Sequence, residues 1–325
     1  MKTLIEAVNE ALHQELERDP SVLVMGEDVG VLGGVFRATA GLRERFGPER
    51  CFDTPLAEAG IIGTAVGLAL AGWRPVCEMQ FDAFSYPALD QLITHVGRYR
   101  ARSGGRVNMS LVVRMPYGGG VGAPELHQDS PETYYLHPAG LKVAVPSTPA
   151  DAKGLLSAAI RDPDPVVIFE PKRLYRSLRG EVPPGDWIVP LGQARVVAPG
   201  DDITLIAYGA MVSVALGARA ALAEDSIRAE VIDLRTLKPL DEDTVLDSVR
   251  KTGRAVVVQE AARTCGFGAE IAAILAEKAM FDLRGPVVRV TGYDVPYPPY
   301  SIENAFLPSV QRVAEAARRI REMAW

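Results

Sequence analysis

Near the start of the chain, apolar residues first recur at the spacing of a helix and then form a short run that is typical of a strand. Leu4, Val8, Leu12 and Leu16 recur at helical spacing, after a capping box formed by Thr3 and Glu6. Residues 22–25 are all apolar and predict a short buried strand. Further on, Thr54 followed by Pro55 predicts the N-cap and first turn of a second helix.

The alternation continues to the end of the chain. Strands are expected at residues 110–115, 141–145 and 165–170, with a glycine-rich loop at 116–124 and a helix from Thr148 to about residue 161. A second series has strands near 203–208, 229–234, 255–258 and 287–290, and helices near 211–224, 240–252, 267–281 and 309–322. This order predicts α/β architecture with two doubly wound, mostly parallel domains. We place them at residues 1–180 and 201–325, joined by a Pro/Gly-rich linker at 181–200.

Composition narrows the class of protein. The chain has 325 residues, a length that suits two domains. Its net charge of −6 argues against nucleic acid as a partner. No apolar run reaches the roughly 18 to 20 residues that span a bilayer, and residues 1–6 are expected to start a helix and show no signal h-region. The three cysteines form no C-x-x-C pair and suit a reducing compartment. We therefore expect a cytoplasmic protein without membrane or nucleic-acid partners.

One carboxylate, Glu58, stands at the start of an apolar, glycine-studded segment, residues 59–69. A poorly solvated carboxyl group favours its protonated form and can then donate a hydrogen bond to a ring nitrogen. Thiamine diphosphate requires such a donor at its aminopyrimidine. The alternative is an acid placed at the positive end of a helix dipole. Gly60, Gly63 and Gly67 fall near one helix face, which predicts a surface that another backbone, including that of another subunit, can approach closely.

Four other segments are candidates for a site, each with a plainer alternative. Residues 26–30 end the first strand, where α/β sheets bind ligands, or form an ordinary turn. Phe84 could stack on a flat heterocycle or fill the core. His127, on the glycine-rich loop, could steer a substrate and move protons or be a solvated histidine. Residues 160–165 end a helix and carry two aspartates, which suits a cation or a plain turn.

The chain lacks the motif that usually holds the diphosphate end of thiamine diphosphate. Enzymes that use thiamine diphosphate usually hold Mg²⁺ and the diphosphate with a Gly-Asp-Gly…Asn segment, and this chain contains no Gly-Asp-Gly. Its four histidines show no metal-ligand spacing. If the chain works on thiamine diphosphate, another polypeptide must hold the diphosphate end.

Together these segments resemble the β subunit of the thiamine diphosphate-dependent decarboxylating component of 2-oxo acid dehydrogenase complexes. That family includes the pyruvate, branched-chain 2-oxo acid and acetoin dehydrogenases. The resemblance covers essentially the whole chain and is carried by Gly26-Glu27-Asp28-Val29-Gly30, Asp53-Thr54-Pro55-Leu56-Ala57-Glu58, Ser103-Gly104-Gly105, Pro124-Glu125-Leu126-His127, Gly140-Leu141-Lys142-Val143, Asp151-Ala152-Lys153-Gly154-Leu155-Leu156, Asp233-Leu234-Arg235-Thr236 and Lys251-Thr252-Gly253-Arg254.

The resemblance implies a pyrimidine-binding first domain and a transketolase C-terminal-like second domain. It implies an α2β2 assembly with thiamine diphosphate shared between α and β, Mg²⁺ on the α subunit and docking on a lipoyl acyltransferase core. The implied reaction is the oxidative decarboxylation of a 2-oxo acid with reductive acylation of the lipoyl group.

Roles for single residues follow only from the resemblance. Glu58 would activate the aminopyrimidine, Phe84 would stack on it and Leu56 would line its pocket. His127 would face the substrate and the lipoyl group, although Gln128-Asp129 replaces the Ser-Gln of many relatives. Acids that line a tunnel between two sites match Glu27 and Asp90. A possible structural potassium site matches Leu111, Ala159, Ile160, Asp162 and Asp164.

Different segments of the chain favour different substrates. Residues 169–176 and 292–294 favour the branched-chain group, whereas residues 209–212 and 238–241 favour bacterial pyruvate relatives. The alternatives are an acetoin dehydrogenase β subunit, half of a split transketolase-type enzyme and a non-catalytic scaffold subunit. An intact Glu58 argues against the scaffold, and no basic pocket for a sugar phosphate is evident.

Overall fold

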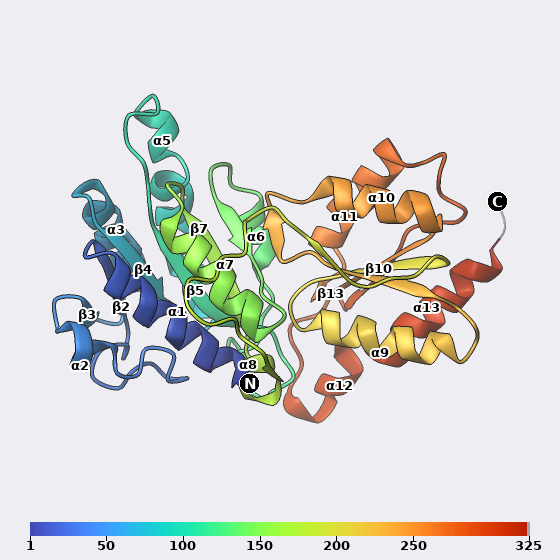
Figure 1. Ribbon diagram of the computed structural model, residues 1–325, viewed down its shortest axis with the longest axis horizontal. Helices are drawn as coiled ribbons and strands as arrows, with labels where there is room; N and C mark the ends of the chain where they lie inside the picture. The colour runs from blue at the N-terminus through green and yellow to red at the C-terminus, as the bar shows by residue number, and fades with distance from the viewer. Residues whose placement is uncertain (324–325) are drawn as a thin grey trace. The chain divides into compact units, whose positions relative to one another are not determined.

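The computed structural model describes residues 1–323, which divide into two compact units (Figure 1). The first unit contains Met1–Gly118, Leu126–Leu191 and Leu237–Pro239. The second contains Gly119–Glu125, Gly192–Thr236 and the rest of the described chain from Leu240. Two short segments therefore belong to a different unit from their neighbours in sequence: Gly119–Glu125 is part of the second unit, and Leu237–Pro239 is part of the first.

A seven-stranded sheet forms the centre of the first unit. Its strands, in spatial order, are β12 (Thr236–Lys238), β6 (Lys142–Ala144), β7 (Val166–Pro171), β5 (Val112–Tyr117), β4 (Arg74–Glu78), β2 (Val22–Gly26) and β3 (Cys51–Asp53). The pairs from β6 to β3 are parallel, and the register sets Gly26 beside Asp53 and Glu78. Separately, β1 (Lys2–Thr3) pairs with β8 (Arg179–Gly180) in a small antiparallel sheet.

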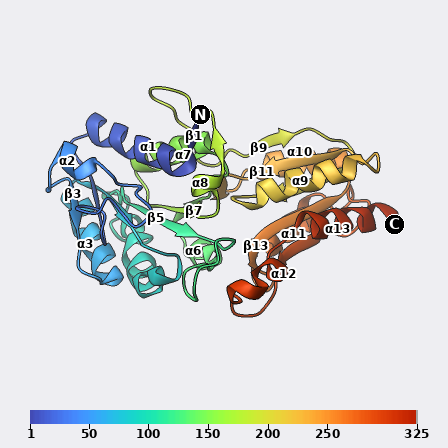
Figure 2. The same cartoon turned by 90° about the horizontal axis from the view of Figure 1, so that it is seen from below.

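Helices cover both faces of this sheet (Figures 1 and 2). On one face α1 packs against α7, and on the other α3 packs against β4 and η1. Because both faces are covered, the central strands are buried along their length and read as apolar runs. The helices are α1 (Leu4–Arg18), α2 (Leu42–Phe46), α3 (Glu58–Leu70), η1 (Ala83–Ala88), α4 (Leu89–Gln91), η2 (Leu92–Val96), α5 (Tyr99–Arg102), α6 (Glu132–Leu136), α7 (Pro149–Arg161) and α8 (Leu174–Ser177).

The predicted capping box of α1 is confirmed, but the predicted start of α3 is wrong. The Thr3 backbone N–H donates to the Glu6 carboxylate at 2.7 Å, and the Glu6 N–H donates to Thr3 Oγ1 at 3.3 Å. The helix α3 begins at Glu58, with Ala57 at the N-cap and no side-chain cap. The Thr54 N–H donates to the Gly26 carbonyl at 2.9 Å, so Thr54 continues the sheet instead of capping the helix.

The glycine face of α3 is open to the rest of residues 1–323 at Gly67 and nearly so at Gly63. A Cβ at Gly67 would meet no atom within 4 Å, and one at Gly63 would meet only the Gln91 side chain, at 3.6 Å. The expected packing of this face against another backbone therefore stays a prediction about a partner.

The second unit is built on a five-stranded sheet. Its order is β14 (Val288–Gly292), β13 (Ala255–Ala262), β10 (Ile203–Ala207), β11 (Ala229–Asp233) and β9 (Arg195–Ala198). All pairs are parallel except β9 with β11, and β9 forms inside the segment expected to be a linker. In Figure 1, α10 (Glu242–Thr252) and α11 (Phe267–Lys278) lie above this sheet, and α9 (Met211–Ala223) and α13 (Val310–Glu322) lie below it. Two short elements, η3 (Tyr300–Ile302) and α12 (Glu303–Phe306), precede α13.

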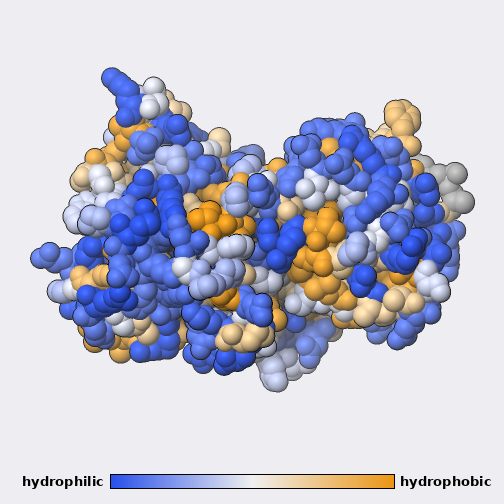
Figure 3. All heavy atoms as spheres, viewed as in Figure 1, coloured by the Kyte–Doolittle hydropathy of each residue, from blue (hydrophilic) through white to orange (hydrophobic). Residues whose placement is uncertain are grey.

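The predicted α/β fold class, with a central, mostly parallel sheet in each unit, is thus confirmed. The face of the molecule drawn in Figure 3 is largely hydrophilic, with hydrophobic patches in both units. Within residues 1–323, no helix combines the length and the apolar character that crossing a bilayer requires.

Candidate functional site

The predicted catalytic and cofactor-binding residues follow the carboxyl ends of neighbouring parallel strands. Glu27 follows β2, Glu58 follows β3, Phe84 follows β4 and His127 follows β5. Because these strands are parallel, their carboxyl ends meet at one edge of the sheet, where open α/β sheets bind ligands. The contact between α3 and η1 also brings the helix of Glu58 against the segment that carries Phe84.

Glu27 and Glu58 are near enough for the charge of Glu58 to act on Glu27. Glu27 is 7% exposed, and its Oε1 has no hydrogen-bond partner in the described chain. Burial, and next the negative charge of Glu58, raise the pKa of Glu27. Glu58 itself is half-buried at the first turn of α3. A buried, unsatisfied acid beside a second acid is a marker of a functional site.

The backbone around Glu27 is held under strain. Asp28 has a φ of 60°, in the left-handed region of backbone conformation that residues other than glycine seldom adopt. Gln80 holds its carboxylate at 2.8 Å. Asp53, at the end of β3, accepts the N–H groups of Gly30 at 2.7 Å and Val31 at 3.1 Å. These bonds fix the loop that follows Glu27.

We expect Glu27→Gln to raise the thermal midpoint of unfolding. The folded state holds the pKa of Glu27 above its unfolded value, so the stability it contributes is lost as the pH rises through the folded value. The glutamine side chain stays uncharged at every pH, so the variant does not lose this stability when the pH rises. The midpoint should rise by on the order of 1–2 °C at about pH 8 and by less at about pH 4. Calorimetry at both pH values tests this, and a lower midpoint at pH 8 would contradict it.

Apolar side chains lie exposed around these acids. Leu56, two residues before Glu58, is 80% exposed, and Val31, Leu32 and Val35 on the loop after Glu27 are 67%, 56% and 45% exposed. A group of large exposed apolar residues marks a surface that binds a ligand or a partner. We call Val31, Leu32, Val35 and Leu56 the apolar rim.

The predicted aromatic and histidine residues meet. The ring centroid of His127 lies 4.3 Å from that of Phe81 and 4.8 Å from that of Phe84, both edge-on. All three side chains are half-buried. Phe84 thus keeps part of its ring accessible, as a stacking residue requires. Asp90, by contrast, is exposed on α4, where its carboxylate contacts the Gln91 amide at 3.2 Å.

Two buried cations near this edge were not singled out by sequence reasoning. Arg114 of β5 is fully buried between Glu78 and Glu170, and Lys172, directly after β7, is buried against Asp82. A signal was available, since a charged residue inside or next to an apolar strand must find a partner. Which carboxylate serves as that partner depends on the strand order.

The predicted potassium ligands lie around the end of α7, except Leu111, which directly precedes β5, and their oxygens already accept hydrogen bonds. Arg74 Nη1 donates to the carbonyls of Ile160 at 2.9 Å and Asp162 at 3.3 Å. Lys142 Nζ contacts the Asp162 carboxylate at 2.7 Å, and Arg100 pairs with Asp164. The remaining carbonyls, of Leu111 and Ala159, accept from Val166 and Asp162. The oxygen donors suit a hard cation, which would share them with Arg74.

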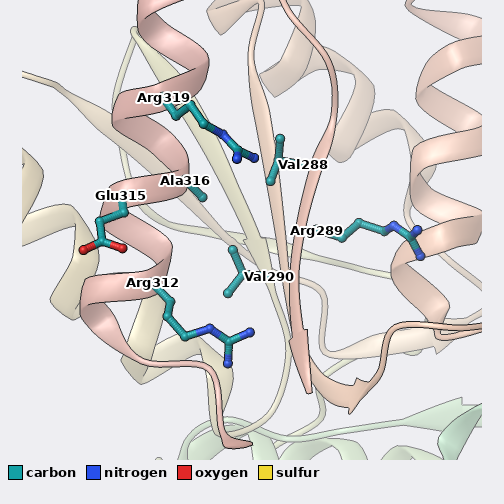
Figure 4. Close-up of a pocket in the computed structure, with 7 residues that line it drawn as sticks. All are labelled: Val288, Arg289, Val290, Arg312, Glu315, Ala316 and Arg319. Carbon is teal, nitrogen blue, oxygen red and sulfur yellow. The ribbon is translucent and has the colours of Figure 1, made fainter. Parts of the chain in front are cut away.

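A groove of about 440 Å³ lies in the second unit between β14 and α13 and contains none of the predicted site residues. Figure 4 shows Arg312 and Arg319 reaching from α13 toward the strand, with Glu315 directed away from it. Arg312 donates to the carbonyls of Thr291, Phe306 and Leu307 at 2.7–3.1 Å. These bonds make Arg312 a structural cation. Within residues 1–323, no group of three or more His, Cys, Asp or Glu side chains is placed to hold a metal ion.

Comparison with known proteins agrees with this architecture. The transketolase pyrimidine-binding domain family matches residues 1–177, and the transketolase C-terminal domain family matches residues 192–313. A solved structure described as a split gene transketolase, an inactive β4 tetramer, superposes with a TM-score of 0.82 over 99% of both chains at 24% identity, which supports the fold.

Two curated relatives are similar over nearly the whole chain. The pyruvate dehydrogenase E1 component subunit beta of Bacillus subtilis (strain 168) is 51% identical over 320 residues, 98% of each chain. The 3-methyl-2-oxobutanoate dehydrogenase subunit beta of Mycobacterium tuberculosis (strain ATCC 25618 / H37Rv) is 50% identical over 319 residues, 98% of this chain and 91% of that protein. The chain therefore belongs to the family of 2-oxo acid dehydrogenase β subunits, built from the transketolase pyrimidine-binding and C-terminal domains.

Proposed function

We propose that this chain is the β subunit of a thiamine diphosphate-dependent dehydrogenase that decarboxylates pyruvate or a branched-chain 2-oxo acid and transfers the acyl group to a lipoyl group. The observation that carries the proposal is the pair of acids at one sheet edge. Glu58 is half-buried beside the buried, unpartnered Glu27, and the half-buried Phe84 follows the neighbouring strand.

These residues fit the aminopyrimidine end of thiamine diphosphate. When bound, that cofactor supplies the carbon nucleophile and accepts the electrons released with CO₂. Glu58 would hold a proton at a ring nitrogen, and Phe84 and Leu56 would orient the ring and exclude water. Glu27 would keep a second proton-binding oxygen beside Glu58. His127 would bind the substrate and the incoming lipoyl group.

The site requires a second polypeptide. The chain lacks a Gly-Asp-Gly segment for Mg²⁺ and the diphosphate, and its apolar rim is open to solvent. We propose that an α subunit covers this rim, supplies the diphosphate end and completes an α2β2 assembly that docks on a lipoyl acyltransferase core. The relatives are named as β subunits, which supports a partner of this kind.

We also propose that potassium binds at the end of α7 and stabilises the fold without taking part in the reaction. With a dissociation constant of about 1 mM, about 100 mM KCl would stabilise the folded state by roughly 2.7 kcal/mol. The thermal midpoint should therefore be several degrees higher in KCl than in NaCl of equal concentration. Equal midpoints in the two salts would mean that Arg74 and Lys142 supply the positive charge alone.

The test of function is purification of the tagged chain from its native host. An equimolar partner with a Gly-Asp-Gly…Asn segment, together with thiamine-dependent release of CO₂ from a 2-oxo acid, would establish the proposal. A panel of pyruvate, 3-methyl-2-oxobutanoate and acetoin then separates the candidate substrates. A pair that stays inactive on the panel would overturn the dehydrogenase assignment, and activity on sugar phosphates alone would move it to a split transketolase-type enzyme.

A further inference from the structure

A buried ion pair lies directly behind His127. Lys172, the first residue after β7, has a side chain that is 1% exposed, and its Nζ contacts the Asp82 carboxylate at 2.6 Å. The same Nζ donates to the backbone carbonyl of His127 and lies 5.5 Å from the ring centroid of Phe81. The ammonium group thus joins the end of β7 to the loop that carries His127.

Asp82 extends this connection to the aromatic segment. Its carboxylate also accepts the N–H groups of Ala83, at 2.8 Å, and of Asp129, at 3.2 Å. Asp82 caps η1, the helix that carries Phe84. Burial raises the pKa of Asp82 to about 6, against the opposing effect of Lys172. The charged form of Asp82 therefore depends on Lys172.

The loop itself needs such a tether. Leu126, directly before His127, has a φ of 65°, a strained conformation for a leucine. The residues before it, Gly119–Glu125, belong to the second unit, where Glu303 accepts the Gly120 N–H at 2.8 Å. After it, Tyr86 donates to the Asp129 carboxylate at 2.7 Å. Lys172, directly after β7, donates directly to the backbone carbonyl of His127.

We propose that Lys172, held by Asp82, is the positioning residue for His127: it fixes the His127 backbone so that the imidazole stays against Phe81 and Phe84 while the lipoyl group is acylated. This inference rests on the proposed function. Lys172 acts through His127 and touches no reacting atom.

The experiment separates positioning from stability with a neutral pair. In Lys172→Met/Asp82→Asn no unpaired charge stays buried, so the thermal midpoint should stay within a few degrees of the wild type. The tether to His127 is nevertheless gone. In the reconstituted assembly with its α subunit, kcat for acylation of a lipoyl domain should fall by about 10- to 100-fold, since small misplacements have effects of that size.

A double-mutant cycle with His127→Ala shows whether Lys172 acts through the histidine. In the His127→Ala background, the neutral pair should lower kcat by less than about twofold further, because there is no imidazole left to misplace. Amide hydrogen exchange of the cofactor-free assembly gives a readout without catalysis. Residues 126–130 should exchange faster in the neutral pair, and β5 and β7 should not.

A matched control is available in Lys153, whose Nζ is also buried and contacts a carboxylate, Glu10 at 3.3 Å, and a carbonyl, Pro183 at 2.8 Å. Lys153→Met/Glu10→Gln should leave acylation unchanged. Full additivity in the cycle, or wild-type kcat and exchange in the neutral pair, would overturn the positioning role. Failure of the proposed function looks different: the wild-type assembly would not decarboxylate any 2-oxo acid, while the exchange result would still test the tether.

Discussion

Replacing Glu58 by Gln is expected to lower kcat for 2-oxo acid decarboxylation by about 10²–10⁴-fold, the usual contribution of a positioned acid–base group. The amide keeps the shape of the side chain but cannot give up and recover a proton at a ring nitrogen. Glu58 is half-buried, and no hydrogen bond or ion pair of its side chain is present within residues 1–323. Assembly with the α subunit and the thermal midpoint should therefore stay unchanged.

The control for this variant is Glu270→Gln. Glu270 is an exposed acid in the first turn of α11, in the second unit, so, like Glu58, it lies in the first turn of a helix, but it lies outside the site. Its replacement should leave kcat unchanged. Steady-state kinetics on the purified α2β2 assemblies measures both variants. Near-normal decarboxylation by Glu58→Gln would remove Glu58 from the reaction.

Arg114→Met is expected to have the largest effect on stability, a loss of about 3–5 kcal/mol in the free energy of unfolding. The guanidinium donates to Glu170 at 2.6 and 2.8 Å and also pairs with Glu78. Arg114 and Glu170 are each 1% exposed and Glu78 is 4% exposed. Methionine fills much of the space but leaves two carboxylates buried without their cation. Tyr175 continues to donate to Glu170 at 2.5 Å, which offsets only part of the loss.

The loss should depend on pH in a defined direction. Burial already raises the pKa of Glu78 in the presence of Arg114, and the variant removes the opposing positive charge. A raised folded-state pKa contributes stability that is complete below the unfolded value, near 4.3, and is lost as the pH rises through the folded value. The variant should thus be less destabilised at about pH 5 than at about pH 8.

Urea unfolding at both pH values measures this difference. A matched control is Arg228→Met, because Arg228 pairs with Asp201 at 3.1 Å on an exposed surface, where such pairs contribute about 0–1 kcal/mol. A loss below about 1 kcal/mol for Arg114→Met, or a larger loss at the lower pH, would show that the cluster is not held together by this charge.

Local hydrogen bonding and hydrophobic spacing are enough to predict the longer helices and most of the central strands. The capping box at Thr3 and Glu6 joins groups three residues apart, and central strands such as β2 and β10 are largely apolar. The start of α3 was predicted wrongly because Thr54 is used by the sheet, through its bond to Gly26, which the local sequence does not reveal. The strand β9 was missed for a similar reason, since its pairing with β11 is antiparallel and distant in sequence.

The sequence by itself determined the two α/β units, the family and the acid at the head of α3. Only the tertiary structure decided the partners of the buried charges. Lys172 meets Asp82 across 90 positions and His127 across 45, and Arg114 meets Glu170 across 56. Periodicity and capping act over one or two turns of chain. Pairing of these charges depends instead on which strands are neighbours in the sheet, and that order is set when the whole unit packs.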